Sequence, residues 1–78
     1  MRTRQLRLIV TFHTTTAAIA LEKTCAEKGV SGRLIPVPRD ITAGCGMAWS
    51  APPEARKAIE QAAREAGIKT DGWYELTV

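Results

Sequence analysis

Aromatic residues are scarce in this chain, which has two tryptophans, one tyrosine and one phenylalanine among its 78 residues. Proteins that bind single-stranded nucleic acid stack bases on aromatic side chains gathered on one surface. The basic residues are also scattered along the chain, and the net charge is only +3. We therefore expect no nucleic-acid partner, although a mildly basic surface could attract a small anion or an acidic protein.

Long apolar runs are missing as well. The longest falls far short of the roughly 20 residues that a membrane span needs. The basic N-terminus leads into an apolar run that Arg7 and Thr11 interrupt, and no signal-peptide cleavage pattern follows. We expect a cytoplasmic protein with no membrane association, and its short length predicts a single domain over 1–78.

Metal-binding residues are few. The chain has two cysteines, Cys25 and Cys45, and one histidine, His13. No Cys-x-x-Cys pair is present, and one thiol with one imidazole makes a poor metal site. We expect no metal and no cofactor, and in the cytoplasm we expect the cysteines as reduced thiols.

Apolar periodicity predicts four strands and two helices in the order β-α-β-β-α-β. The predicted strands cover 6–12, 33–37, 47–50 and 73–78. The first predicted helix covers 17–28, and the second starts at Pro52 and Pro53 and ends at Gly67. Pro36 favours an edge position for the second strand, because proline cannot donate a ladder hydrogen bond. This order predicts an α+β fold, the ferredoxin-like split βαβ sandwich, with a four-stranded antiparallel sheet and both helices on one face.

The helical spacing also predicts which faces are buried. The predicted buried stripe of the first helix comprises Ala18, Leu21 and Cys25, and that of the second comprises Ala55, Ala58, Ile59, Ala62 and Ala66. Core packing is thus the expected role of Cys25.

Cys45 stands between Gly44 and Gly46. The two glycines leave the thiol unshielded along the backbone and allow close approach of a partner. In the predicted topology, this loop lies at the same end of the sheet as the turn from the first strand into the first helix. Cys45 is therefore expected near His13, Thr14 and the helix N-terminus, which lowers the pKa of a nearby thiol.

Arg39 lies six residues before Cys45 in the same loop and is the candidate cation beside the thiol. The backbone amides of the loop could add a small anion-binding nest. Cys25 lies roughly 16 Å along the first helix at 1.5 Å per residue, so we expect no disulfide between the two cysteines. A purely structural explanation remains open for each of these residues. The loop could be a plain hairpin with an incidental cysteine, and Arg39 could be an ordinary solvated side chain. His13 could be a surface residue, and Thr14 could serve only as a helix cap.

The run 35–46 resembles the signature of the sulfur/selenium (Se/S) carrier-like family of small prokaryotic proteins, a Pro-x-Pro-Arg run followed by Cys-Gly. The matching positions are Pro36, Pro38, Arg39, Cys45 and Gly46, and Gly72, Trp73 and Tyr74 are also similar. Thr42 and Ala43 stand where serines are common in the family. The resemblance implies that Cys45 accepts sulfur or selenium as a persulfide or selenopersulfide and passes it from a donor protein to an acceptor protein.

Two other functions remain open. A small thiol-dependent sulfurtransferase would need His13 as a base, yet the loop offers no clear carboxylate to orient it. A non-catalytic interaction module would use the same fold without thiol chemistry. One displayed thiol favours a carrier over a stand-alone enzyme. A homodimer through the edge strand near Val78 is also left open.

Overall fold

The computed structural model describes residues 5–38 and 46–77, and its elements follow the predicted order. The strands are β1 (Leu6–Thr11), β2 (Arg33–Pro36), β3 (Met47–Ala51) and β4 (Gly72–Thr77). The helices are α1 (Thr15–Lys28) and α2 (Arg56–Ala66), and a short 3-10 turn, η1 (Pro53–Ala55), leads into α2. Three candidate site residues, Arg39, Gly44 and Cys45, lie outside the described residues.

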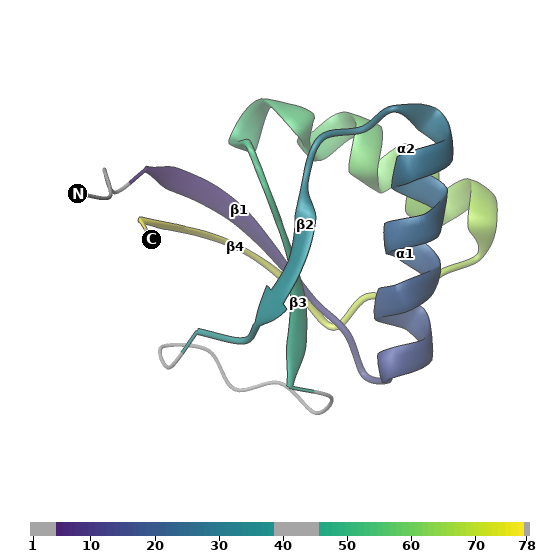
Figure 1. Ribbon diagram of the computed structural model, residues 1–78, viewed down its shortest axis with the longest axis horizontal. Helices are drawn as coiled ribbons and strands as arrows, with labels where there is room; N and C mark the ends of the chain where they lie inside the picture. Colours follow the sequence, from purple (N-terminus) through teal and green to yellow (C-terminus); the bar gives the residue numbers. More distant parts are fainter. Residues whose placement is uncertain (1–4, 39–45, 78) are drawn as a thin grey trace.

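The four strands form one antiparallel sheet in the order β2-β3-β1-β4. Both helices cover the same face of this sheet (Figure 1). The prediction of a ferredoxin-like α+β fold is confirmed. β2 lies at an edge of the sheet, as Pro36 predicts, because an edge strand leaves one row of backbone groups unpaired.

The main core fills the space between the sheet and the helices. Alternate strand residues point to opposite faces, and those on the helix side pack against the apolar stripes of α1 and α2. The buried residues of this core are Leu8, Val10, Phe12, Ala18, Leu21, Cys25, Trp49, Ala51, Ile59 and Ala63. Burial of this apolar surface is the main force that holds the helices on the sheet.

A smaller apolar cluster lies on the other face of the sheet. Ile9 and Ala48 are fully buried there, with Ile35, Val37 and Leu76 packed around them. The sequence pattern predicts only partial cover for Ile9, so the burial of this face is greater than expected.

The predicted buried stripe is right for α1 and partly wrong for α2. Ala18, Leu21 and Cys25 are buried in α1. In α2 the buried residues are Ile59, Ala62 and Ala63, while Ala58 and Ala66 are exposed. Alanine has so small a side chain that exposing it costs little, and an alanine-rich helix therefore indicates its buried face poorly.

Gly32 lies against the indole ring of Trp49. A Cβ atom built on Gly32 would lie 2.5 Å from the Cε2 and Nε1 atoms of Trp49. The backbone there has a φ of +147°, which side-chain-bearing residues rarely adopt. Both the space and the backbone conformation thus require glycine in the connection that enters β2.

Candidate functional site

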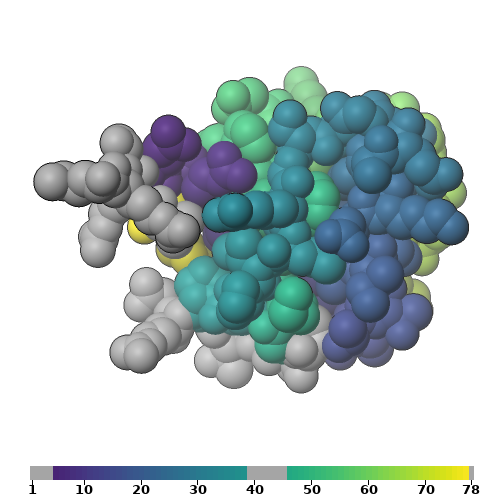
Figure 2. Space-filling model, viewed as in Figure 1, coloured from purple at the N-terminus to yellow at the C-terminus, as the bar shows by residue number. Residues whose placement is uncertain are grey.

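The β2–β3 connection leaves and re-enters the sheet at the end where β1 passes into α1 (Figure 1). A hydrogen bond of 3.0 Å from the Val37 N–H to the Gly46 carbonyl lies at the base of the connection. In the space-filling view, the end of β2 and the start of β3 lie at the surface beside the first turns of α1 (Figure 2). The predicted position of the loop itself falls on residues 39–45, which lie outside the described part of the chain.

The strand register relates the cysteine loop to His13. β3 is antiparallel to β1, and Thr11 lies opposite Ala48. The pairing of the two strands ends there; His13 follows Thr11 by two residues, and Gly46 precedes Ala48 by two residues. Cys45 itself lies outside the described residues, so its position beside His13 stays a prediction.

Gly46 is exposed and has a φ of +76°, in the left-handed region. No atom lies within 4 Å of the position that a Cβ atom would occupy. Glycine is therefore favoured here by the backbone conformation and not by lack of space. The residue after Cys45 thus turns the chain sharply as it enters β3.

Thr14 is the N-cap of α1. Its extended backbone has φ −136° and ψ 152°, and its hydroxyl oxygen accepts a hydrogen bond of 3.1 Å from the Ala17 N–H. This bond satisfies one of the amides that a helix start leaves unpaired. α1 has no acidic residue in its first turn, so no carboxylate there offsets the positive end of the helix dipole.

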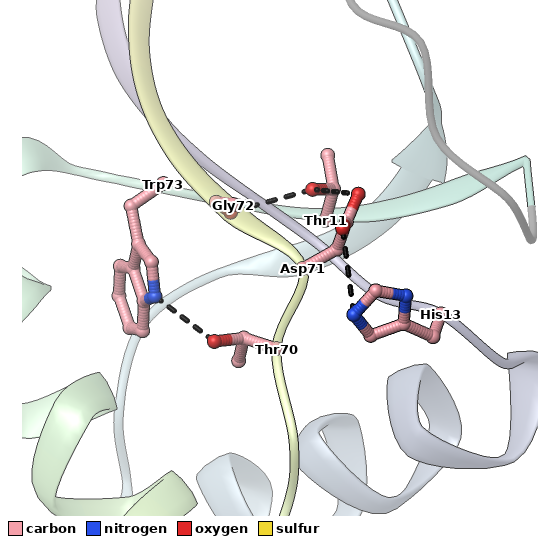
Figure 3. Close-up of polar contacts among 6 residues, drawn as sticks. All are labelled: Thr11, His13, Thr70, Asp71, Gly72 and Trp73. Atoms are coloured by element: carbon pink, nitrogen blue, oxygen red, sulfur yellow. Dashed lines mark hydrogen bonds and ion pairs between the residues drawn. The ribbon is translucent and has the colours of Figure 1, made fainter.

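His13 contacts the carboxylate of Asp71, which comes from the turn before β4 (Figure 3). The His13 Nε2 and Asp71 Oδ1 atoms are 3.4 Å apart. The side chain of His13 is 67% exposed and that of Asp71 is 29% exposed. The sequence indicates Asp71 only as part of a turn and reveals no carboxylate for His13, so this contact is a residue pair that sequence reasoning missed.

Thr11 fixes the position of Asp71 on the side of β1. The Asp71 N–H donates a hydrogen bond of 2.7 Å to the Thr11 carbonyl. The hydroxyl of Thr11, which is fully buried, lies 3.4 Å from both Asp71 Oδ2 and the Gly72 carbonyl and can donate to either (Figure 3). Asp71 is therefore attached to β1, one of the two inner strands of the sheet, through both its backbone and its side chain.

Trp73 fixes the same turn from the helix side. Its indole N–H donates a hydrogen bond of 3.0 Å to the Thr70 hydroxyl (Figure 3). The guanidinium carbon of Arg56, at the start of α2, lies 5.6 Å from the centre of the Trp73 ring, within the range of a cation–π interaction. The residues on both sides of Asp71 are thus held in place.

Cys25 is a free thiol in the main core and has no exposed surface. Burial raises the pKa of the Cys25 thiol, because a charged thiolate is poorly solvated there. The prediction that Cys25 packs in the core is confirmed. Among the residues that the structure describes, no group of three or more acidic, histidine or cysteine side chains could hold a metal ion, and no helix is long and apolar enough to cross a membrane.

The fold defines a small ferredoxin-like α+β protein, and in the described part of the chain its one thiol, Cys25, is buried in the core. The family model described as "Putative Se/S carrier protein-like" matches residues 7–75. The chain therefore belongs to this Se/S carrier-like family. No curated protein and no solved structure matches it.

Proposed function

We propose that this protein is a sulfur or selenium carrier that holds its cargo on Cys45 as a persulfide or selenopersulfide. The observation that carries the proposal is membership of the Se/S carrier-like family over residues 7–75. The burial of Cys25 supports the choice of thiol, since a core cysteine with a raised pKa cannot meet a donor. Cys45 is then the thiol left to carry the cargo.

The proposed loading step is a thiol exchange. The Cys45 thiolate attacks the outer sulfur of a donor persulfide, R–S–SH, and the donor S–S bond breaks. The products are a persulfide on Cys45 and the donor thiol R–SH, so one proton moves from Cys45 to the donor and no oxidant is needed. Attack of an acceptor thiolate on the outer sulfur of loaded Cys45 releases the cargo in the same way.

Several groups would favour the anionic form of Cys45. The N-terminus of α1, the positive end of its helix dipole, lies at this end of the sheet, and the first turn of α1 has no acidic residue to neutralise it. Arg39 and the amides around Gly44 and Gly46 would add charge and hydrogen-bond donors. In this proposal the donor and the acceptor are cytoplasmic proteins. A homodimer would form through β4, which is an edge strand.

One observation favours a second candidate, a small sulfurtransferase. The contact between His13 and Asp71 supplies the histidine–carboxylate pair that the sequence did not reveal. An enzyme of this kind would turn over a persulfide donor with a small thiol as acceptor and would need no partner protein.

The two candidates differ in stoichiometry. Purified protein incubated with excess of a small persulfide donor is expected to gain one sulfur atom per chain and then stop, as measured by intact mass under non-reducing conditions. Continuous release of product on addition of a small acceptor thiol would favour the enzyme. Failure of the wild-type protein to gain any sulfur would contradict both.

A further inference from the structure

Arg7 and Arg33 share the face of the sheet that lies opposite the helices, here called the open face (Figure 1). Ile9 belongs to the apolar cluster on this face, and Arg7 precedes it by two residues in β1, so both side chains point to the same side. Ser50 lies opposite Ile9 in the pairing of β3 with β1, and Arg33 lies opposite Ser50 in the pairing of β2 with β3. Residues directly opposite each other share a face, so two arginines and a serine are neighbours on the open face.

Ser50 holds the guanidinium of Arg7 in place. The Arg7 Nε–H donates a hydrogen bond of 3.1 Å to Ser50 Oγ, and Nη2 donates one of 3.4 Å to the Ser50 carbonyl. Ser50 is only 4% exposed and Arg7 is half-buried, so this anchor lies in the sheet surface. A guanidinium has five N–H donors, and Ser50 accepts from one edge of it. The end of the guanidinium keeps a parallel pair of N–H groups, which matches two oxygens of one carboxylate or phosphate.

The two arginines have no acidic partner in the part of the chain that the structure describes, where the ion pairs join His13 with Asp71, Lys28 with Glu65 and Arg56 with Glu60. The other acidic side chains of residues 5–38 and 46–77 belong to α1, η1 and β4. In β4, Glu75 lies opposite Leu8 of the main core and therefore on the helix side of the sheet. Positive charge on the open face is thus left without a counter-charge from these residues.

The two positive charges also lie close together. The Arg7 guanidinium contacts Ser50, and the Cβ atoms of directly opposite residues such as Ser50 and Arg33 are about 4.5–5.5 Å apart. Like charges repel, and they repel more strongly beside apolar surroundings such as the fully buried Ile9. Guanidinium groups only donate hydrogen bonds. An anion with several acceptor oxygens would replace this repulsion with attraction to both arginines.

We propose that Arg7 and Arg33 form a binding site for an oxyanion, either a carboxylate of an acidic protein or a free phosphate-type ion. The end of the Arg7 guanidinium binds two oxygens of the anion, Arg33 adds the second positive charge, and Ser50 orients Arg7. The site uses no residue of the cysteine loop, so its test is independent of the carrier function.

The test is a nuclear magnetic resonance titration of the full-length, ¹⁵N-labelled protein at constant ionic strength. One series replaces sodium chloride by sodium phosphate, and a second adds a hexaglutamate peptide. We expect saturable shifts of the Arg7 Nε–H signal and of the Ser50 and Arg33 amide signals. Arg7→Gln and Arg33→Gln should each weaken binding by about tenfold or more, the range of a hydrogen bond to a charged group.

Arg64→Gln is the matched control, because it removes the same charge from an exposed residue of α2, on the helix side of the sheet. It should leave the affinity unchanged. Arg7→Lys keeps the charge but lacks the planar pair of donors, so it should weaken binding almost as much as Arg7→Gln. Ser50→Ala should weaken binding a few-fold, and Ser50→Thr, which keeps a hydroxyl, should restore it.

Circular dichroism would establish that each variant is folded, and Arg33→Gln changes an exposed side chain, so its result does not depend on packing.

The two probes distinguish the source of the anion. Tighter binding of the peptide, with further shifts at Ile35 and Leu76 of the open-face cluster, would identify a protein carboxylate as the ligand. Binding of phosphate as tight as that of the peptide, or tighter, would identify a small ion. Either result supports the site.

Three results would overturn the inference. The first is the absence of saturable shifts with both probes. The second is wild-type affinity in Arg7→Gln and Arg33→Gln, or in Arg7→Lys. The third is equal weakening by Arg64→Gln, which would show that the anion responds only to the net charge of the protein.

Discussion

Replacement of Cys45 by serine should abolish the gain of sulfur from a persulfide donor. A serine hydroxyl is far less nucleophilic at neutral pH than a thiol that is partly ionised, and it forms no persulfide. The loss should be complete, because Cys25 is buried and free within the core and cannot replace the missing thiol. Intact mass after incubation with the donor is the measurement.

Cys25→Ala is the control for this experiment. The variant removes the other cysteine sulfur of the chain from a position with no exposed surface, and it should still gain one sulfur atom. Loading that survives in Cys45→Ser and disappears in Cys25→Ala would assign the chemistry to Cys25 instead. It would also mean that the core opens to admit a donor.

Gly32→Ala should destabilise the fold more than alanine at a helix-ending glycine such as Gly29. The new Cβ would lie 2.5 Å from the Trp49 ring, which is 2% exposed and cannot move away without disturbing the core. Overpacking and backbone strain at φ +147° together should lower the free energy of unfolding by about 2–3 kcal/mol. That is a large part of the roughly 4–12 kcal/mol available to a domain of this length.

Gly29→Ala separates the cost of backbone strain from the cost of steric overlap with Trp49. Gly29 is the C-cap of α1 with a φ of +71°, but nothing lies within 4 Å of its Cβ position. Its replacement should cost only about 1 kcal/mol, the usual penalty for alanine in a left-handed conformation. Urea unfolding followed by circular dichroism gives both values. Equal costs at the two positions would show that contact with Trp49 contributes nothing.

The fold could be predicted from the sequence because local signals agree with one another. Leu8, Val10 and Phe12 alternate as a half-buried strand requires, and all three are buried. Gly29 and Gly67 end the two helices in the left-handed conformation that their sequence positions indicate. The order of elements then leaves few ways to build a sheet from four strands, and the ferredoxin-like one is observed.

Features that depend on side-chain size or on contacts between distant parts of the chain are harder to predict from the sequence. Helical spacing predicts Ala58 and Ala66 on the buried face of α2, but both are exposed, because alanine is tolerated on either side of a helix. The requirement for glycine at position 32 depends on Trp49, which belongs to a different strand. Local periodicity contains no information about such a contact.

In the candidate site, too, local features are predicted from the sequence and long-range contacts are not. The capping role of Thr14 follows from its place before a helix, and the structure confirms it. The contact between His13 and Asp71 arises only when β1 and β4 pair. A signal was nevertheless present, because a ferredoxin-like order places the residue before the last strand beside the end of the first.

The central claim is that Cys45 carries the cargo. The most direct measurement is tandem mass spectrometry of peptides from wild-type protein that has been treated with a persulfide donor and blocked with an alkylating agent. We expect the additional sulfur on the peptide that contains Cys45, with Cys25 unmodified. An additional sulfur on Cys25, or on neither cysteine, would contradict the claim.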